Sequence, residues 1–199
     1  MEVEFWYEFA STYSFLAAER AQPMVEGAGH RLVLRPFLLG PIFAAQGWRD
    51  SPFNLYPAKG RYMWRDMERL CRDRRLEFRR PAVFPKNGLN AARIAFLGQD
   101  APWGVPFTRL VYRANFQDDL DIADLDVLAT LLEQMGVEPK EVIARSRQDD
   151  IKRGLRAQTE RAIELGIFGA PTFVVGGELF WGDDRLQDAL RWAVGLVKS

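Results

Sequence analysis

The chain has 199 residues, which is enough for one sizeable domain or for a core fold with a large insertion. Apolar residues make up 48% of the sequence and aromatic residues 13%, a composition that excludes a disordered chain. Lys plus Arg and Asp plus Glu number 27 each, so no net charge attracts nucleic acid or an anionic membrane, and we expect neither partner.

The beginning of the chain predicts no export. Glu2 and Glu4 stand where a secretory signal would carry basic residues, and a strand-like run follows directly. No stretch approaches the roughly 18 to 20 apolar residues of a membrane-spanning helix. Cys71 is the only cysteine, so no internal disulfide forms. These features predict a cytoplasmic protein.

The first forty residues predict a βαβ unit. Residues 3–9, VEFWYEF, have high β propensity, and residues 12–27 are rich in helix formers and end at Gly27. Residues 31–39, RLVLRPFLL, follow as a second strand, with Pro36 at its end or at a sheet edge. This spacing predicts a parallel pair of strands with a right-handed crossover.

The chain changes character at Gly40. Residues 40–60 are rich in Gly, Pro and aromatic residues and predict a long ordered loop with one turn of helix. Periodic apolar residues then predict helices over 61–75, 90–97, 106–115, 122–135, 140–145 and 149–166. Cys71 falls on the apolar stripe of the first of these helices, which predicts a buried structural thiol.

The last quarter returns to β structure. Residues 170–182, APTFVVGGELFWG, predict two short strands joined at Gly176 and Gly177, and residues 183–198 predict a final helix. A βαβ unit followed by ββα is the thioredoxin plan. We therefore predict an α/β, thioredoxin-like domain from residues 1–39 plus 166–199, with 40–165 forming a large all-helical insertion.

Several catalytic classes are disfavoured by what the sequence lacks. His30 is the only histidine, and no HExxH motif or cluster of Cys and His predicts a metal site. No phosphate-binding glycine motif follows a strand. Ser11 is in no G-x-S-x-G elbow, so a serine hydrolase is a poor fit.

The break between the first strand and the first helix carries Ser11 and Ser14, spaced as S-x-x-S. In the thioredoxin plan the reactive residues occupy this place, where unpaired N–H groups and the helix dipole favour a thiolate. A plain N-cap at Ser11 or Thr12 is the alternative. The plan also has a cis-proline before the third strand, and Pro171 in GAPTFVV stands at the required place.

Four segments carry a family resemblance: FWYEFASTYSFLA, YPAKGRYMWRD, FPKNGLNAAR and GIFGAPTFVVGGELFWGDDRL. Together they resemble the 2-hydroxychromene-2-carboxylate isomerase family, which is grouped with the kappa-class glutathione transferases and DsbA-like proteins. In DsbA-like relatives the first helix opens with C-x-x-C. A hydroxyl forms no disulfide, so S-x-x-S excludes thiol–disulfide exchange on this motif.

The resemblance implies glutathione as the source of sulfur. Ser11 would donate a hydrogen bond to the sulfur and favour its thiolate. Ala170 and Pro171 would lie opposite and pair with the cysteinyl part of the peptide. The turn formed by Trp181, Gly182, Asp183 and Asp184 would hold the γ-glutamyl end, the aspartates accepting from its ammonium; simple helix capping is the alternative role for the two aspartates.

The implied reaction is isomerisation of an aromatic, anionic chromene by reversible thiolate addition, ring opening and elimination, with glutathione regenerated. The candidate substrate-binding residues are Phe43, Asn54, Lys59 and Asn87. Asn54 and Lys59 resemble family positions near either the substrate or the glycine end of glutathione. Phe43 departs from the basic residue that naphthalene-degrading members carry near this position, which puts the particular substrate in doubt. The family also implies a homodimer.

Two other functions share the same glutathione site. A kappa-like transferase would conjugate an electrophile and release the adduct. A catalytically silent glutathione-binding protein would keep the pocket without turnover. Ser14 is expected to matter less than Ser11 in all three, because its side chain points one helical turn inward.

Overall fold

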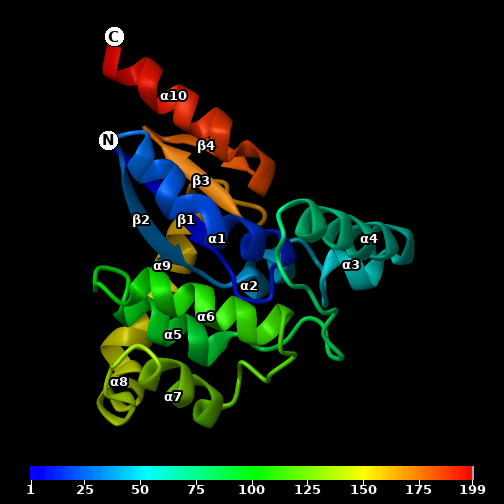
Figure 1. Cartoon of the computed structure of the whole chain (residues 1–199), viewed down its shortest axis with the longest axis vertical. Coiled ribbons are helices and arrows are strands. Elements are labelled where there is room, and N and C mark those ends of the chain that lie inside the picture. The colour runs from blue at the N-terminus through cyan, green and yellow to red at the C-terminus, as the bar shows by residue number, and fades with distance from the viewer. Residues whose placement is uncertain (199) are drawn as a thin grey trace.

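A four-stranded mixed sheet forms the centre of the upper half of the molecule in Figure 1. The computed structural model describes the backbone of residues 1–198 and side chains up to residue 196. The strands are β1 (Glu2–Tyr7), β2 (Arg31–Pro36), β3 (Thr172–Val175) and β4 (Glu178–Trp181), in the order β2-β1-β3-β4. β1 runs parallel to β2 and antiparallel to β3, and β3 pairs antiparallel with β4.

The two faces of the sheet bury different clusters, because successive side chains of a strand point to opposite faces. Phe5 and Tyr7 of β1 belong to the main core, together with residues of α1 (Thr12–Gly27) and α10 (Leu186–Lys198). Trp6 belongs to a second cluster with residues such as Ala162 of α9 (Asp149–Glu164). Helices therefore cover both faces, and this is the thioredoxin-like α/β fold that the sequence predicts.

The chain between β2 and β3 is helical. It contains, besides α9, the helices α2 (Leu39–Ala45), α3 (Pro52–Leu55), α4 (Pro57–Asp73), α5 (Leu89–Leu97), α6 (Gly104–Phe116), α7 (Leu125–Glu133) and α8 (Pro139–Ser146). α3 and α4 project from one side of the sheet, and α5 to α8 form the lower half of the molecule in Figure 1. The predicted helical insertion is present, although α9 returns from it to pack on the sheet.

The prediction of a long loop over residues 40–60 is wrong, because α2, α3 and the start of α4 occupy most of it. The side chain of Ser51 caps α3 by accepting from the N–H of Phe53 at 3.3 Å. Pro52 and Pro57 stand in the first turns of α3 and α4, where the missing N–H of proline costs nothing. These start signals are local and outweigh the weak apolar periodicity of the segment.

Helix α6 docks on α1 and ties the helical region to the sheet. Phe15 and Phe116 stack in the interior at 5.6 Å between ring centroids. At the edge, Arg113 donates two hydrogen bonds to the carboxylate of Glu19, at 2.8 and 2.7 Å.

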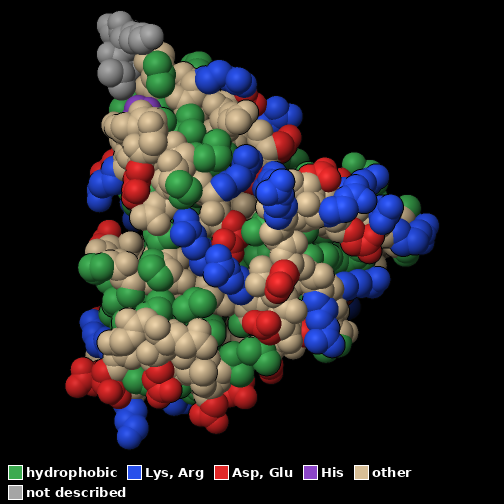
Figure 2. All heavy atoms as spheres, viewed as in Figure 1, with side chains coloured by type: hydrophobic (Ala, Val, Ile, Leu, Met, Phe, Trp, Pro, Cys, Tyr) green, Lys and Arg blue, Asp and Glu red, His purple; other side chains and the backbone are tan. Residues whose placement is uncertain are grey.

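Figure 2 shows basic and acidic side chains interspersed over the face of the molecule that is seen in Figure 1. Among the described residues, no helix is long and apolar enough to cross a membrane.

Candidate active site

The turn between β1 and α1 places Ser11 at the N-cap of α1. Ser11 has extended backbone angles, and its Oγ accepts a hydrogen bond from the N–H of Ser14 at 3.2 Å. The N–H of Ser11 donates to the carbonyl of Glu8 at 3.0 Å. The capping role is therefore present, and it satisfies one of the free N–H groups at the start of the helix.

The same hydroxyl reaches the loop before β3. Ser11 Oγ donates to the carbonyl oxygen of Ala170 at 2.9 Å, across 159 residues of sequence. The Ala170–Pro171 peptide bond is cis. The N–H of Gly182 donates to the carbonyl of Pro171 at 2.9 Å, which joins the turn after β4 to this loop. The fold thus brings together Ser11 and the predicted cis-proline loop.

Ser14 has a different environment from Ser11. Its side chain is fully buried, at 0% exposure, beneath the first turn of α1. The inward direction predicted for Ser14 is therefore confirmed. Of the two hydroxyls of S-x-x-S, that of Ser11 is at the surface of the turn and faces the cis-proline loop.

An exposed aromatic pair flanks the cis-proline loop. Trp181 is 54% exposed, and its ring centroid lies 4.9 Å from that of Phe168. A Cβ atom at Gly169 would lie 2.5 Å from Trp181 Nε1, so only glycine allows the indole to lie this close to the backbone. Phe168 was not among the predicted site residues, since its sequence neighbourhood gives no sign of the stacking partner.

The two aspartates after β4 have separate roles. Asp183 is 3% exposed, and its carboxylate accepts from Arg20 of α1 at 3.0 Å and from Arg74, after α4, at 2.5 Å. Arg20 also donates to the carbonyl of Asp183. Asp184 is exposed and lies 3.4 Å from Arg185. The prediction that both carboxylates face a ligand ammonium needs correction, because that of Asp183 is already bound by two guanidinium groups.

Three of the four predicted substrate-binding residues lie on α3, on α4 and in the 84–88 loop. Asn54 Nδ2 donates to Asp50 and to the carbonyl of Phe84 at 3.0 Å, which links α3 to the 84–88 loop. Lys59 is exposed, with its ammonium 5.5 Å from the ring centroid of Tyr56. Asn87 Oδ1 accepts from the N–H of Leu89 at 3.0 Å. These contacts leave the Lys59 ammonium without an anionic partner among the described residues.

Phe43 lies on α2, where its ring packs 5.5 Å from that of Trp48. No contact in the described part of the chain joins it to Ser11 or to the cis-proline loop. Helix α2 nevertheless approaches that loop, because Ile42 shares the second apolar cluster with Ala170.

Tyr13 is a further residue at the mouth of the site, between the two serines of S-x-x-S. Its hydroxyl donates to Asp66 Oδ2 of α4 at 3.0 Å, and its ring lies 6.4 Å from that of Phe53. Burial and the nearby negative charges of Asp66 and Asp184 raise the pKa of Tyr13. The sequence motif marks the position, but the contacts with α3 and α4 come only from the tertiary fold.

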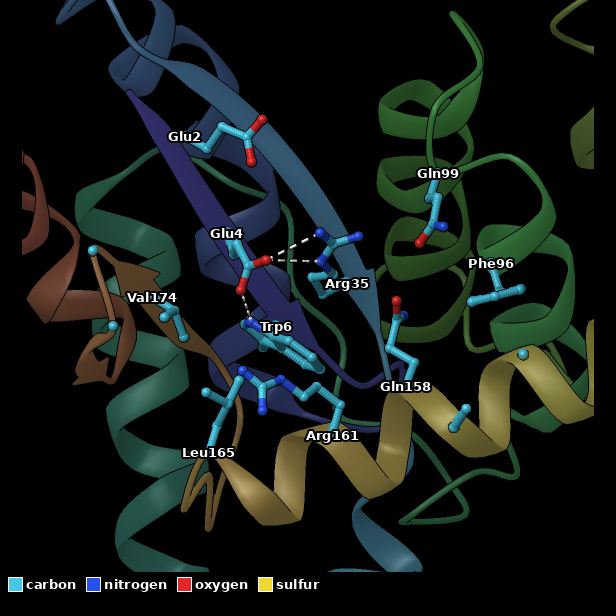
Figure 3. Close-up of a pocket in the computed structure, with 14 residues that line it drawn as sticks. Glu2, Glu4, Trp6, Arg35, Phe96, Gln99, Gln158, Arg161, Leu165 and Val174 are labelled. Atoms are coloured by element: carbon cyan, nitrogen blue, oxygen red, sulfur yellow. Dashed lines mark hydrogen bonds and ion pairs between the residues drawn. The ribbon is translucent and has the colours of Figure 1, made fainter.

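A cavity of about 650 Å³ lies elsewhere, between the sheet and helices α5 and α9 (Figure 3). Glu4 at its wall accepts from Arg35 and from the indole N–H of Trp6. Figure 3 shows Gln158 and Arg161 of α9 on the opposite side. None of the predicted site residues lines this cavity, so it is separate from the Ser11 site.

The fold and the Ser11–cis-proline arrangement define a thioredoxin-like protein of the DsbA type without its cysteines. Residues 2–191 match the DSBA-like thioredoxin domain, and the chain belongs to that family.

Within this family, the chain resembles a named group of enzymes. It is 26% identical to the 2-hydroxychromene-2-carboxylate isomerase of Sphingobium xenophagum, over 93% of this chain and 94% of that protein. The isomerase of Pseudomonas sp. strain C18 is 28% identical, with 92% and 86% covered. A solved 2-hydroxychromene-2-carboxylate isomerase superposes with a TM-score of 0.87 at 22% identity, covering 99% and 96% of the two chains.

A second group is represented by glutathione S-transferase kappa 1 of Caenorhabditis elegans. It is 22% identical over 93% of this chain and 87% of that protein. The resemblance inferred from the sequence motifs is therefore confirmed for both groups of relatives.

Proposed function

We propose that this protein is a glutathione-dependent isomerase of 2-hydroxychromene-2-carboxylate-like aromatic acids. The observation that carries the proposal is the position of Ser11, whose hydroxyl caps α1 and faces the cis Ala170–Pro171 loop. The similarity to three named isomerases over more than nine-tenths of the chain supports the same reaction.

The residues around Ser11 fit the chemistry of glutathione. A hydroxyl donor at the N-terminus of a 16-residue helix favours an anionic sulfur. Asp184 offers an exposed carboxylate for the γ-glutamyl ammonium, and Lys59 offers an unpaired cation for the glycine carboxylate. Trp181 and Gly182 shape the turn that carries Asp184. Glutathione, when bound, would supply the thiolate nucleophile that adds to the substrate and leaves it.

The aromatic acid would then lie against apolar surfaces, one beside the cis-proline loop and one on and after α2. Trp181 with Phe168 forms one such surface, and Phe43 with Trp48 forms another. Asn54, which contacts Phe84 from α3, and Asn87, in the 84–88 loop, are polar candidates for holding the carboxylate. Exclusion of water from the reacting atoms would come from these aromatic rings.

A kappa-like glutathione transferase is the second candidate, supported by the similarity to the nematode enzyme. It would use the same Ser11, Ala170, Pro171 and Asp184 contacts. The difference lies in the fate of the thiol, which an isomerase returns and a transferase consumes. A silent glutathione-binding protein would bind the tripeptide and turn over neither kind of substrate.

Product analysis with free-thiol counting distinguishes the three functions. Incubation with glutathione and 2-hydroxychromene-2-carboxylate should give the ring-opened isomer with the free thiol unchanged. Stoichiometric loss of thiol indicates the transferase, and glutathione binding without turnover indicates the silent protein. The protein's own thiol does not disturb the count, because Cys71 is buried and burial raises its pKa to about 11.

We further propose that the protein forms a homodimer, as the resemblance implies, in the cytoplasm, as the sequence features predict. Sedimentation equilibrium at micromolar concentration should give twice the mass of one chain. A single-chain mass across the concentration range would contradict the dimer and would leave the Ser11 site as it is, since every residue proposed for it comes from one chain.

A further inference from the structure

Glu8 is the acidic residue that follows β1 directly and stands three positions before Ser11. Its carbonyl accepts from the N–H of Ser11 at 3.0 Å and from the hydroxyl of Tyr112, on α6, at 2.9 Å. Its own Oε2 accepts from the N–H of Ala10 at 2.9 Å. The residue is therefore held in the same turn that positions Ser11.

The carboxyl of Glu8 points toward the 84–88 loop. A Cβ atom at Gly88 would lie 3.3 Å from Glu8 Oε1 and 3.0 Å from Phe9 Cβ, so glycine leaves room for the carboxyl. Asn87, a proposed substrate contact, precedes this glycine. Oε1 has no hydrogen-bond partner among the described residues, and the Glu8 side chain is partly reachable by water. One oxygen is thus fixed by Ala10, and the other faces Gly88 without a hydrogen-bond partner among the described residues.

No charged group near Glu8 forms an ion pair with its carboxyl among the described residues. From α6 the facing titratable group is Tyr112, which stays neutral because burial raises its pKa well above the usual range. On the 84–88 loop, Lys86 is engaged by Asp119 at 2.6 Å and by the carbonyl of Leu120. Phe9 and Ile122, which also contact this region, are apolar.

Burial is the main influence on the ionisation of Glu8. It raises the pKa of the carboxyl to about 7, against a smaller opposite effect of the Ala10 N–H. A carboxyl that is half protonated near neutral pH can both take up and release a proton during a reaction. The purely structural role, capping the turn through Ala10, needs only an oxygen acceptor and no titration.

We propose that Glu8 moves the proton during ring opening of the chromene substrate, an inference that rests on the proposed isomerase function. The Glu8 carboxylate takes the proton of the hemiketal hydroxyl, and the bond from the hemiketal carbon to the ring oxygen breaks. That carbon becomes a ketone, and the bonding electron pair stays on the ring oxygen. The resulting phenolate takes the proton from Glu8. One proton moves between two substrate oxygens, and nothing is oxidised or reduced.

The test compares Glu8→Gln with wild type between pH 5 and 9 at saturating glutathione. The amide oxygen of glutamine keeps the Ala10 hydrogen bond, so the turn is retained while proton transfer is lost. We expect kcat to fall about 100-fold, which is typical of lost acid–base catalysis. The inflection of kcat near pH 7 should disappear, and the Kd for glutathione should stay unchanged. Glu26→Gln, on the exposed last turn of α1, is the matched control and should behave as wild type.

A direct titration of Glu8 in the ligand-free protein gives a readout besides activity. In carbon-13-labelled wild-type protein, the Glu8 carboxyl resonance is identified as the one that Glu8→Gln lacks. The chemical shift of this resonance should change with a midpoint near pH 7. A resonance that titrates at the ordinary acidic pH overturns the inference, as does a Glu8→Gln variant with wild-type kcat and pH profile. Failure of wild type to isomerise the chromene at any pH overturns the proposed function itself, and so the two failures are distinguishable.

Discussion

At the scale of single residues, one hydroxyl serves two purposes. Ser11 Oγ accepts from the N–H of Ser14 and donates to the carbonyl of Ala170. A serine oxygen has one proton and two lone pairs, so it can keep the cap while its proton turns to another acceptor. In the proposed complex the glutathione sulfur would be that acceptor, and the cap would remain.

Replacing Ser11 with alanine removes both interactions. We expect Ser11→Ala to lower kcat at least about tenfold, which corresponds to about 1.4 kcal/mol. Loss of the cap should destabilise the fold by about 1 kcal/mol, too little to unfold it. The measurements are steady-state isomerase kinetics and thermal unfolding by circular dichroism.

Ser14→Ala is the matched control for this prediction. The Ser14 side chain is fully buried, and only its backbone N–H takes part in the cap, so its loss should leave kcat within about twofold. Equal loss of activity in both variants would contradict the assignment of the thiol contact to Ser11.

The residue-scale predictions from sequence succeed where a motif fixes the geometry. The place of Ser11 before a helix, and of Pro171 before a strand, follows from local spacing alone. The partners of Asp183 could not be predicted, because Arg20 and Arg74 are 163 and 109 positions away and give no local signal. Glu8 gives only a weak local signal, an acid between the aromatic residues Tyr7 and Phe9, and its place beside Gly88 comes from the tertiary fold alone.

At the scale of elements, the turn after β4 is held by a buried ion triad. Asp183 opens the short 3-10 helix η1 (Asp183–Arg185) and binds guanidinium groups from α1 and from the end of α4. The turn that carries Asp184 is thereby fixed against the helix that carries Ser11. This arrangement separates a structural aspartate from the exposed neighbouring aspartate, Asp184, which is the one proposed to bind glutathione.

Substituting Asn for each aspartate in turn tests whether Asp183 is structural and Asp184 is not. Asp183→Asn should lower the free energy of unfolding by about 2 kcal/mol, because it leaves two partly buried arginines without their counter-ion. Urea unfolding measures this loss. Asp184→Asn should leave stability within about 0.5 kcal/mol, since its side chain is exposed.

Glutathione affinity should be reduced more by Asp184→Asn than by Asp183→Asn, the reverse of the effect on stability. Asp184→Asn should raise the Kd by about tenfold through loss of a charged hydrogen bond, as measured by calorimetry. Wild-type stability in Asp183→Asn, or wild-type affinity in Asp184→Asn, would show that the roles are assigned wrongly.

The helix boundaries show where prediction from apolar periodicity and capping residues succeeds and where it fails. Helix α1 was predicted at Thr12–Gly27 and occurs there, because its serine cap and terminal glycine are strong local signals. The sequence predicts only one turn of helix over residues 40–60, whereas both α2 and α3 form there. Helix α2 is short and has no side-chain cap, so packing decides its place. Ile42 of α2, for example, is buried against residues of the 160s and 170s that no local window contains.

At the scale of the whole molecule, about two-thirds of the chain lies between β2 and β3 without disturbing the sheet. The order β2-β1-β3-β4 follows the βαβ and ββα units, which the sequence predicts from strand and helix order. The arrangement of the helical region around the site could not be predicted in this way. It depends on contacts such as Tyr13 with Asp66 and Asn54 with Phe84.

The partly buried carboxyl of Glu8 should appear in the pH dependence of global stability. Its pKa is raised from 4.5 to about 7 on folding, so the folded state binds the proton more tightly than the unfolded state. The stabilisation from this proton is complete below about pH 4.5, and it is lost as the pH rises through 7. The free energy of unfolding of Glu8→Gln, measured relative to that of wild type, should therefore increase by about 2 kcal/mol as the pH rises from 5 to 8.

Urea unfolding of both proteins at several pH values measures this gain. The difference between the two stability curves matters, because it cancels the titration of all other groups. Parallel curves for wild type and Glu8→Gln would mean that the carboxyl titrates alike in the folded and unfolded states.

A crystal structure with bound glutathione tests the central claim most directly. We predict the sulfur within hydrogen-bond distance of Ser11 Oγ and opposite the cis Ala170–Pro171 bond. The γ-glutamyl ammonium should lie beside Asp184, with Asp183 still bound to Arg20 and Arg74. Glutathione bound with its sulfur away from Ser11, for example in the cavity beside Arg35 in Figure 3, would contradict the claim.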